Sequence, residues 1–122
     1  MLEVLAIVLY SQQPIVPVEE GIASYYTVAS SSPLTASGEA MDDGALTCAM
    51  LEGEFGAYYR VTAENGRRVV CRLNDRGPYV KGRLIDLSRA AMRALHPTAG
   101  LLNVTVERIP ERELPPWLWS GG

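Results

Sequence analysis

Carboxylates carry the clearest potential for chemistry in this sequence of 122 residues. Asp75 lies in the segment NDRGP, beside Arg76 and close to Tyr79, where a tight turn is predicted. A carboxyl group in such a position can transfer protons in acid–base catalysis. Aspartates in turns also commonly bond their own backbone, so the pattern alone leaves both a catalytic and a structural role open for Asp75.

Two other titratable residues favour structural interpretations. Asp86 precedes Ser88 at the start of a predicted helix, where its charge could stabilise the positive end of that helix. His96, the one histidine, directly follows the same helix and is expected to interact with its last carbonyl groups. The sequence contains no glycine-rich phosphate loop followed by a helix, no GxSxG elbow and no HExxH motif.

Two cysteines are too few for a disulfide-rich scaffold or a four-thiolate zinc site. A zinc site would need Cys48, Cys71, His96 and a carboxylate, without CxxC spacing, so we expect no metal and no cofactor. Cys71 shares one face of an alternating strand with Val69 and Leu73, and Cys48 lies in a similar apolar segment. This pattern predicts a disulfide and an oxidising compartment, with free buried thiols as the alternative.

Composition indicates one soluble domain, with 48% hydrophobic and 20% charged residues. The 11 basic and 14 acidic residues give a net charge of -3, which argues against nucleic acid as a partner because phosphate binding needs a basic face. Residues 1–10 are apolar but contain Glu3. They are far shorter than the roughly 20 residues that span a bilayer, and they lack the basic start of a clear signal peptide. We therefore expect no membrane span, and a buried strand over 1–10.

Short strands dominate the predicted elements. They follow in this order: an extended linker over 11–20, a strand over 21–28, a long loop over 29–44, a β-hairpin over 57–73 turning at Asn65-Gly66, a strand over 83–87, a helix over 88–95 and a strand over 102–107. Many short strands with one short helix predict a small closed β-barrel, because closing the sheet removes its exposed edges.

A set of motifs in fixed order gives a more specific indication. They are GIASYY (21–26), LTASGE (34–39), ALTCAM (45–50), FGAYYRVT (55–62), NGRRVVCRLNDRGPYVKGRLIDLSRAAMRAL (65–95) and VTVERI (104–109). Together they resemble the RlpA-like domain of septal lytic transglycosylases. The resemblance implies a mainly β fold, a six-stranded double-psi β-barrel with one short helix, over 21–110. A strand and linker would precede it over 1–20, and a tail would follow over 111–122.

The resemblance also implies a function and a site. The barrel would bind a peptidoglycan glycan strand across an open groove, with Asp75 as general acid on the bond between N-acetylmuramic acid and N-acetylglucosamine. The muramyl 6-hydroxyl would then attack the anomeric carbon and give a 1,6-anhydro product. We expect the residues that bind substrate to be Tyr25, Tyr26, Glu39, Met50, Arg76 and Tyr79, with the tyrosine rings at 25 or 26 packing on sugar faces.

One departure from the family pattern bears on catalysis. Met50 occupies the position of the family's histidine, and a thioether cannot donate a proton. Glu52 and Glu54 lie nearby and could supply a substitute acid or base, or simply be surface residues. The alternative function is therefore a weak or inactive glycan-binding or structural module, such as a phage virion or tail component. Either function implies an extracytoplasmic location, in the periplasm, cell envelope or virion, with virion or cell-envelope proteins as further partners.

Overall fold

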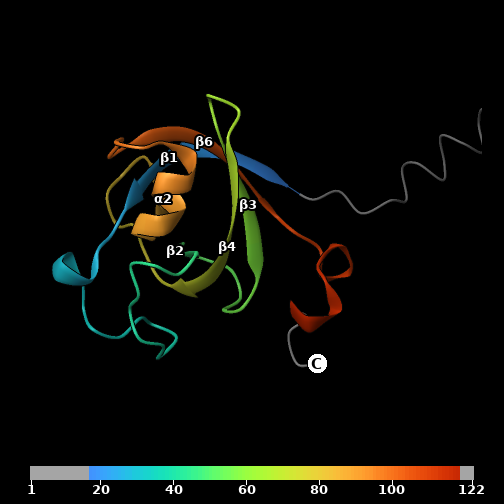
Figure 1. The fold of residues 1–122 in the computed structure, drawn as a ribbon, viewed down its shortest axis with the longest axis horizontal. Helices are drawn as coiled ribbons and strands as arrows, with labels where there is room; N and C mark the ends of the chain where they lie inside the picture. The colour runs from blue at the N-terminus through green and yellow to red at the C-terminus, as the bar shows by residue number, and fades with distance from the viewer. Residues whose placement is uncertain (1–16, 119–122) are drawn as a thin grey trace, which may run out of the picture.

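Six strands close into a barrel in the computed structural model, which describes residues 17–118 (Figure 1). The strands are β1 (Val18–Tyr25), β2 (Thr47–Ala49), β3 (Tyr58–Ala63), β4 (Arg68–Asp75), β5 (Arg83–Leu87) and β6 (Leu102–Arg108). Around the barrel the order is β1-β5-β2-β4-β3-β6, and β6 pairs back with β1. The pairs β1–β5 and β2–β4 are parallel, and the others are antiparallel. The predicted mainly β, double-psi barrel fold is confirmed.

The hairpin of β3 and β4 forms where the sequence predicts it. Residues on β3 and β4 pair from Tyr58↔Arg72 to Thr62↔Arg68. The Gly66 N–H donates to the carbonyl of Ala63, and Gly66 has a φ of 87°, in the left-handed region that glycine adopts at no steric cost. Within the turn only the glycine has a positive φ, which is typical of a type I turn followed by a glycine bulge.

The first strand differs from the expected boundaries at both ends. It begins at Val18, inside the segment expected to be a linker, because residues 18–20 pair with residues 105–107 of β6. It ends at Tyr25, and Val28–Ser30 forms the short 3-10 helix η1 instead of continuing the strand. Pairing with a partner strand thus overrides the low strand preference of the two glutamates, both of which are exposed. The strand expected over 1–10 lies outside the described residues.

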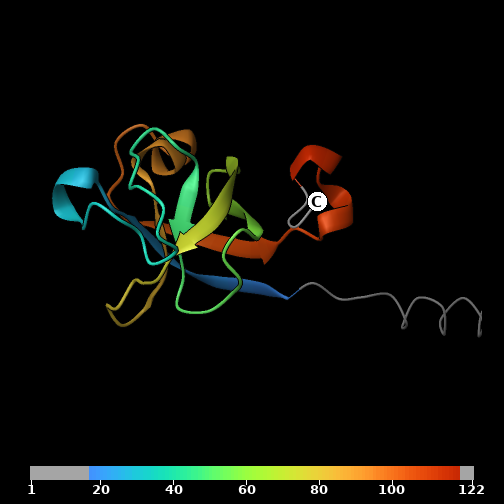
Figure 2. The same cartoon turned by 90° about the horizontal axis from the view of Figure 1, so that it is seen from below.

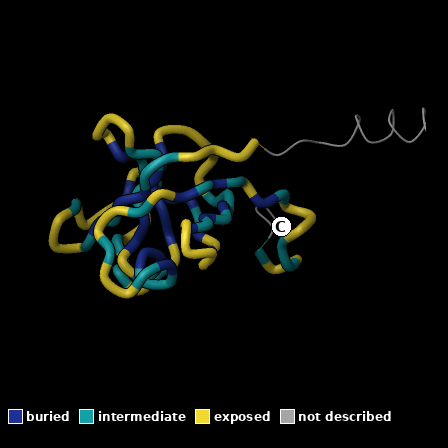
Figure 3. Tube along the Cα trace, turned by 90° about the horizontal axis from the view of Figure 1, so that it is seen from above, coloured by how far each residue is buried: buried dark blue, intermediate teal, exposed yellow. Residues whose placement is uncertain are grey.

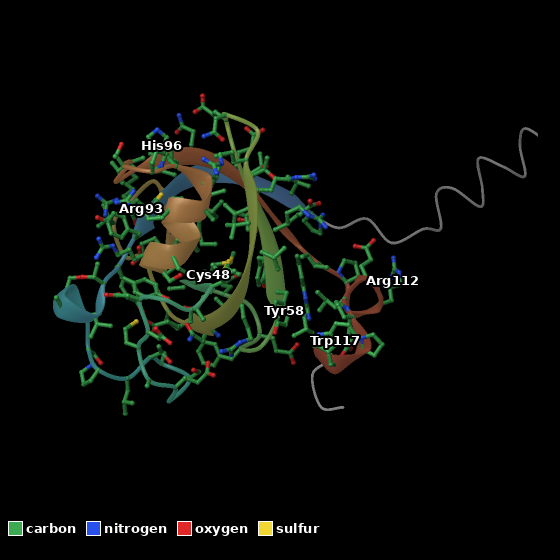
Figure 4. All side chains as sticks on the ribbon, in the orientation of Figure 1. Cys48, Tyr58, Arg93, His96, Arg112 and Trp117 are labelled. Atoms are coloured by element: carbon green, nitrogen blue, oxygen red, sulfur yellow. A yellow bond between two sulfur atoms is a disulfide. The ribbon has the colours of Figure 1, made fainter. Side chains whose placement is uncertain are left out.

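The core fills the barrel interior, and the exposed segments are mostly loops around it (Figure 3). Cys48 and Cys71 are fully buried there and form a disulfide with a Cα–Cα distance of 5.8 Å, which confirms the predicted pairing. Figure 4 shows the Cys48 sulfur in the interior. The other fully buried large side chains come from β3, β4, β5 and the helix: Val61, Leu73, Ile85, Leu87, Met92 and Leu95.

The α-helix, α2 (Arg89–Leu95), closes one side of the barrel and packs mainly on β4. Its cap is Ser88, as predicted: the Ser88 hydroxyl accepts from the Ala91 N–H and donates to the Ala45 carbonyl, at 3.2 and 2.6 Å. Two further 3-10 helices follow β6, η2 (Glu111–Glu113) and η3 (Pro116–Leu118). Both views place them at the end of the molecule opposite η1 (Figures 1 and 2). Trp117 in η3 is 82% exposed.

Candidate active-site groove

A bulge in β4 determines which way Asp75 faces. Along the parallel pair of β2 and β4, Thr47 pairs with Arg72 and Cys48 with Leu73, but Ala49 pairs with Asp75. Asn74 is therefore one extra residue. Because side chains alternate between faces along a strand, the extra residue turns Asp75 away from the core face of Leu73 and onto the outer face of Arg72.

The carboxylate of Asp75 is held by backbone donors. Its Oδ1 accepts from the Ala36 N–H and from the Arg76 N–H, both at 2.8 Å. Ala36 belongs to the long loop between β1 and β2, so this bond ties the loop to the end of β4. Among the described residues, both hydrogen bonds to this carboxylate go to Oδ1. Oδ2 is therefore the oxygen that can transfer a proton to a substrate. Asp75 is half-buried, and we call the outer face of the barrel around it the groove.

A second carboxylate, that of Asp86, lies on the same face. From the sequence it was expected to act at the start of the helix. Ala49 pairs on its other side with Asp86 of β5, so Asp75 and Asp86 flank it on neighbouring strands. With strands about 4.8 Å apart, their Cα atoms are separated by roughly 10 Å. Burial raises the pKa of Asp86 above its usual value, and the Ser24 hydroxyl donates to Oδ1 at 3.2 Å.

Asp86 has a hydrogen-bond partner that its predicted role at the helix start did not include. The helix is capped by Ser88, whereas Asp86 bonds to Ser24 on β1. A signal for its orientation was present in the sequence. Asp86 lies between Ile85 and Leu87, both fully buried, so alternation alone places its side chain on the opposite face.

The two adjacent tyrosines do not present their rings as expected. Tyr26 is only 6% exposed, so its ring cannot pack on a sugar. Its hydroxyl is 2.8 Å from the Thr47 Oγ1, and burial raises the pKa of Tyr26 to about 12, with the charges of Asp75 and Asp86 acting in the same direction. The Tyr25 ring lies 5.0 Å from the Arg93 guanidinium, on the α2 side of the barrel (Figure 4). Tyr26 thus belongs to the groove through its hydroxyl and Tyr25 packs elsewhere.

Glu39 approaches the site, as expected, through an ion pair. Arg72 donates from two nitrogens to the two carboxylate oxygens of Glu39, at 2.8 and 2.9 Å. The hydrogen bond from Arg72 lowers the pKa of Glu39 below its usual value. The pair borders a cavity of about 230 Å³, which we call the loop pocket, and its lining residues are Glu39, Ala40, Asp42, Ala45, Thr47, Arg72 and Asn74.

Arg76 binds the protein rather than facing an open groove. Its Nη2 donates to the Gly53 carbonyl at 2.7 Å, and its guanidinium lies 4.2 Å from the centre of the Phe55 ring. Arg76 therefore holds the loop between β2 and β3. Met50 starts this loop and donates its N–H to the Asp75 carbonyl at 3.3 Å, so position 50 directly adjoins Asp75.

The other acids of this loop are surface residues. Glu52 is exposed, and Glu54 makes an exposed ion pair with Arg108 at 3.5 Å. Tyr79, which follows the NDRGP segment, is 80% exposed and offers an aromatic surface beyond the end of β4. Of the expected binding residues, Glu39, Met50 and Arg76 thus come from segments in contact with the Asp75 strand.

His96 lies far from this groove, at the opposite end of the molecule from the loop that precedes β2 (Figure 4). Its Nδ1 accepts from the Thr98 and Ala99 N–H groups, at 3.1 and 3.0 Å. The expected interaction with the last helix carbonyls is therefore wrong, because the ring acts as an acceptor for the loop after the helix. Within residues 17–118, no group of three or more potential metal-ligating side chains is found, and no helix is long and apolar enough to cross a bilayer.

A larger hollow, of about 490 Å³, lies over β1, β3 and β6. Its titratable lining residues are Glu20 and Glu64. At the groove, by contrast, Asp75 and Asp86 flank Ala49, and Asn74 beside Asp75 lines the loop pocket. We therefore take the groove as the candidate site on chemical grounds, although the hollow is larger.

Comparisons with known proteins show the family of this chain. The sequence model of the family described as "Lytic transglycolase" matches residues 18–106. The chain is 44% identical over 93 residues to the probable endolytic peptidoglycan transglycosylase RlpA of Treponema pallidum, covering 75% of this chain and 28% of that protein. It is 49% identical over 77 residues to the endolytic peptidoglycan transglycosylase RlpA of Yersinia pestis, covering 62% and 21%. The chain thus spans less than a third of the length of these relatives.

Solved structures agree on the fold. The Streptomyces papain inhibitor superposes with a TM-score of 0.65 at 24% identity, covering 80% of this chain and 98% of that one. The apo Clavibacter michiganensis expansin has a TM-score of 0.62 at 20% identity, covering 81% and 54%. At such identities the likeness is one of fold. The closed barrel and the family match together show that this chain belongs to the lytic transglycolase family and carries its RlpA-like double-psi β-barrel.

Proposed function

We propose that this domain binds peptidoglycan glycan strands and cleaves them as a lytic transglycosylase, with Asp75 as the catalytic acid. The observation that carries the proposal is the orientation of Asp75. The bulge at Asn74 turns the carboxyl onto the groove face, and two backbone N–H groups fix its Oδ1. The names of the relatives, which are endolytic peptidoglycan transglycosylases, support the substrate class.

The reaction needs one residue to transfer a proton twice. Protonated Asp75 gives its proton to the glycosidic oxygen as the bond between that oxygen and the muramyl C1 breaks. The muramyl C6 hydroxyl attacks C1, and its proton passes to the Asp75 carboxylate. The product carries a 1,6-anhydro ring, and Asp75 is restored to its protonated form. Because the nucleophile is part of the substrate, the reaction needs no second carboxylate to activate a water molecule. An inverting hydrolase does need one.

Asp86 and Tyr26 would assist by charge and hydrogen bonding. Positive charge develops at the anomeric carbon in the oxocarbenium-like transition state, and an ionised Asp86 on the same face would stabilise that charge. The Tyr26 hydroxyl remains protonated at neutral pH, since its pKa is about 12, and can donate a hydrogen bond. Asp86 lies on β5, across β2 from Asp75, and Tyr26 directly follows β1, which pairs with β5.

A second candidate function is glycan binding without efficient cleavage. The observation that favours it is Met50, a side chain without acid–base capacity at the position that adjoins Asp75. The groove and Glu39 would still hold a glycan strand. In either case the partner is peptidoglycan, and the buried Cys48–Cys71 disulfide favours an oxidising, extracytoplasmic compartment. Association with virion or other cell-envelope proteins stays a prediction.

Purified peptidoglycan distinguishes these functions. We expect the wild type to release 1,6-anhydromuropeptides, detected by mass spectrometry, and Asp75→Asn to release none. Glu64→Gln, which makes the same chemical change on the exposed hairpin, serves as control and should retain full activity. Product release by Asp75→Asn at the wild-type rate contradicts the catalytic role. Binding to peptidoglycan without any anhydro product from the wild type supports the binding module instead.

A further inference from the structure

The loop pocket contains a buried polar group that the proposed reaction does not use. Asn74, the extra residue of the bulge, is 3% exposed and lines this pocket. Its side chain is also among the causes that lower the pKa of the Glu39 carboxyl, after the larger effect of Arg72. Its Oδ1 is buried and has no hydrogen-bond partner among the described residues. Buried acceptors are rarely left unpaired, so this oxygen calls for a donor that the described part of the chain does not supply.

The surroundings of Asn74 limit what that donor can be. The Arg72 guanidinium has N–H groups beyond the two that bond Glu39, so it can donate a hydrogen bond into the pocket. Ala40 and Ala45 line the same pocket and supply apolar surface. The pocket thus offers an acceptor, donors and an apolar patch within about 230 Å³. A small neutral group that combines an N–H, a carbonyl oxygen and a methyl group matches all three features.

We propose that the loop pocket binds the 2-acetamido group of the amino sugar whose anomeric carbon lies at Asp75, with its N–H donating to the Asn74 Oδ1. This inference rests on the proposed function and deepens it. In such a sugar the acetamido group is attached to C2, next to the reacting C1. Asn74 likewise adjoins Asp75 in β4, where it is the extra residue of the bulge. Because the Asn74 Oδ1 is buried in the free protein, this bond requires side chains that line the pocket to move when the sugar binds.

The pocket therefore makes Asn74 a specificity-determining residue. A glucan of the same length has a hydroxyl group at C2, which can donate a hydrogen bond but lacks the carbonyl and the methyl group. A site built around a buried polar atom discriminates strongly against ligands that leave its groups unpaired. The domain should accordingly prefer N-acetylated strands over plain glucans of equal length.

Calorimetric titration with two soluble hexasaccharides tests this inference without requiring turnover. We expect the wild type to bind hexa-N-acetylchitohexaose about tenfold or more tightly than cellohexaose, the equivalent of one or two hydrogen bonds. Asn74→Leu keeps the volume and removes the acceptor, so it should bring the two affinities within about twofold by weakening only the N-acetylated ligand. Asn74→Ala should do the same if Leu disturbs folding, which thermal unfolding reports.

Asn103→Leu is the matched control, because Asn103 is exposed on β6 and away from Asp75. It should leave both affinities unchanged. Equal binding of the two hexasaccharides by the wild type overturns the acetamido site but leaves glycan binding intact. The acetamido site is also overturned if the Asn74 variants lower the affinity for both hexasaccharides equally, because that result indicates a structural role for Asn74. Binding of neither hexasaccharide contradicts glycan binding itself, and with it the proposed function.

Discussion

At the scale of single residues, the pair of positions 50 and 75 connects backbone structure to chemistry. The Met50 N–H bonds to the Asp75 carbonyl, so a side chain at position 50 starts beside the proposed acid. Position 50 is only 8% exposed, so its burial favours the apolar thioether of Met50, which packs in the core. A histidine there would exchange some of that packing for a group that transfers protons near neutral pH.

Met50→His should therefore raise the rate of anhydromuropeptide release. Positioned acid–base groups contribute about 10²- to 10⁴-fold to rates, and we expect a gain of at least about tenfold. Met41→His places the same side chain in the preceding loop and should give no gain. The rate is measured on purified peptidoglycan by counting anhydro ends. An unchanged rate in a correctly folded Met50→His variant means that position 50 does not take part in proton transfer.

Asp86 makes stability depend on pH in a defined direction. Burial raises its folded pKa above the unfolded value, so the folded chain binds this proton more tightly. The resulting stabilisation is fully present below the unfolded pKa of about 3.9, and it is lost as pH rises from there through the folded pKa.

Asp86→Asn removes this titration and keeps an acceptor for Ser24. Its melting temperature should exceed that of the wild type at pH 7, and the difference should shrink towards about pH 3. Melting curves across that range provide the measurement, with Glu64→Gln as the exposed control. A difference in melting temperature that does not change with pH would show that Asp86 ionises as freely in the folded as in the unfolded chain.

At the scale of elements, the sequence predicts those elements whose formation depends on residues close to one another in the chain. The β3–β4 hairpin, β5 and the Ser88-capped helix follow from alternation, a glycine turn and a capping residue close in sequence. The bulge at Asn74 could not be predicted, because it exists only relative to β2, more than twenty residues earlier. The same long-range pairing places Asp86 beside Asp75. The rings of Tyr25 and Tyr26 were misjudged because their environment comes from α2 and β2, not from their own strand.

Arg76 anchors the loop between β2 and β3, over residues 51–56. Its guanidinium bonds the Gly53 carbonyl and covers the Phe55 ring, so Arg76→Ala removes both interactions. We expect a loss of about 1–2 kcal/mol in the free energy of unfolding, since the site is partly exposed. Urea unfolding gives the value, and amide hydrogen exchange should accelerate in the loop but not in β3.

Arg67→Ala, on the exposed hairpin, is the control and should change the free energy of unfolding by less than about 0.5 kcal/mol. If loop exchange is unaltered in Arg76→Ala, then Arg76 is free to serve the substrate directly. A loss of glycan affinity with unchanged stability would support that direct role.

At the scale of the whole molecule, barrel closure and the disulfide act on the same strands. β2 has only three residues, yet it joins β5 to β4 and carries Ala49 between the two aspartates. Cys48 at its centre is bonded to Cys71 in β4, with both residues fully buried in the core. The covalent bond thus fixes the shortest strand of the barrel next to the strand that bears Asp75.

Replacing both cysteines by alanine should therefore weaken the whole barrel. The disulfide closes a loop with a sequence separation of 23, for which the chain-entropy estimate is about 3 kcal/mol. Guanidinium unfolding of Cys48→Ala/Cys71→Ala should show a loss of at least that size in one cooperative transition, because the missing sulfurs also leave space in the core. Wild type incubated with reductant under native conditions is the control and should keep its disulfide, since both sulfurs are buried. A double variant as stable as the wild type would mean that the strand pairings alone hold β2 in place.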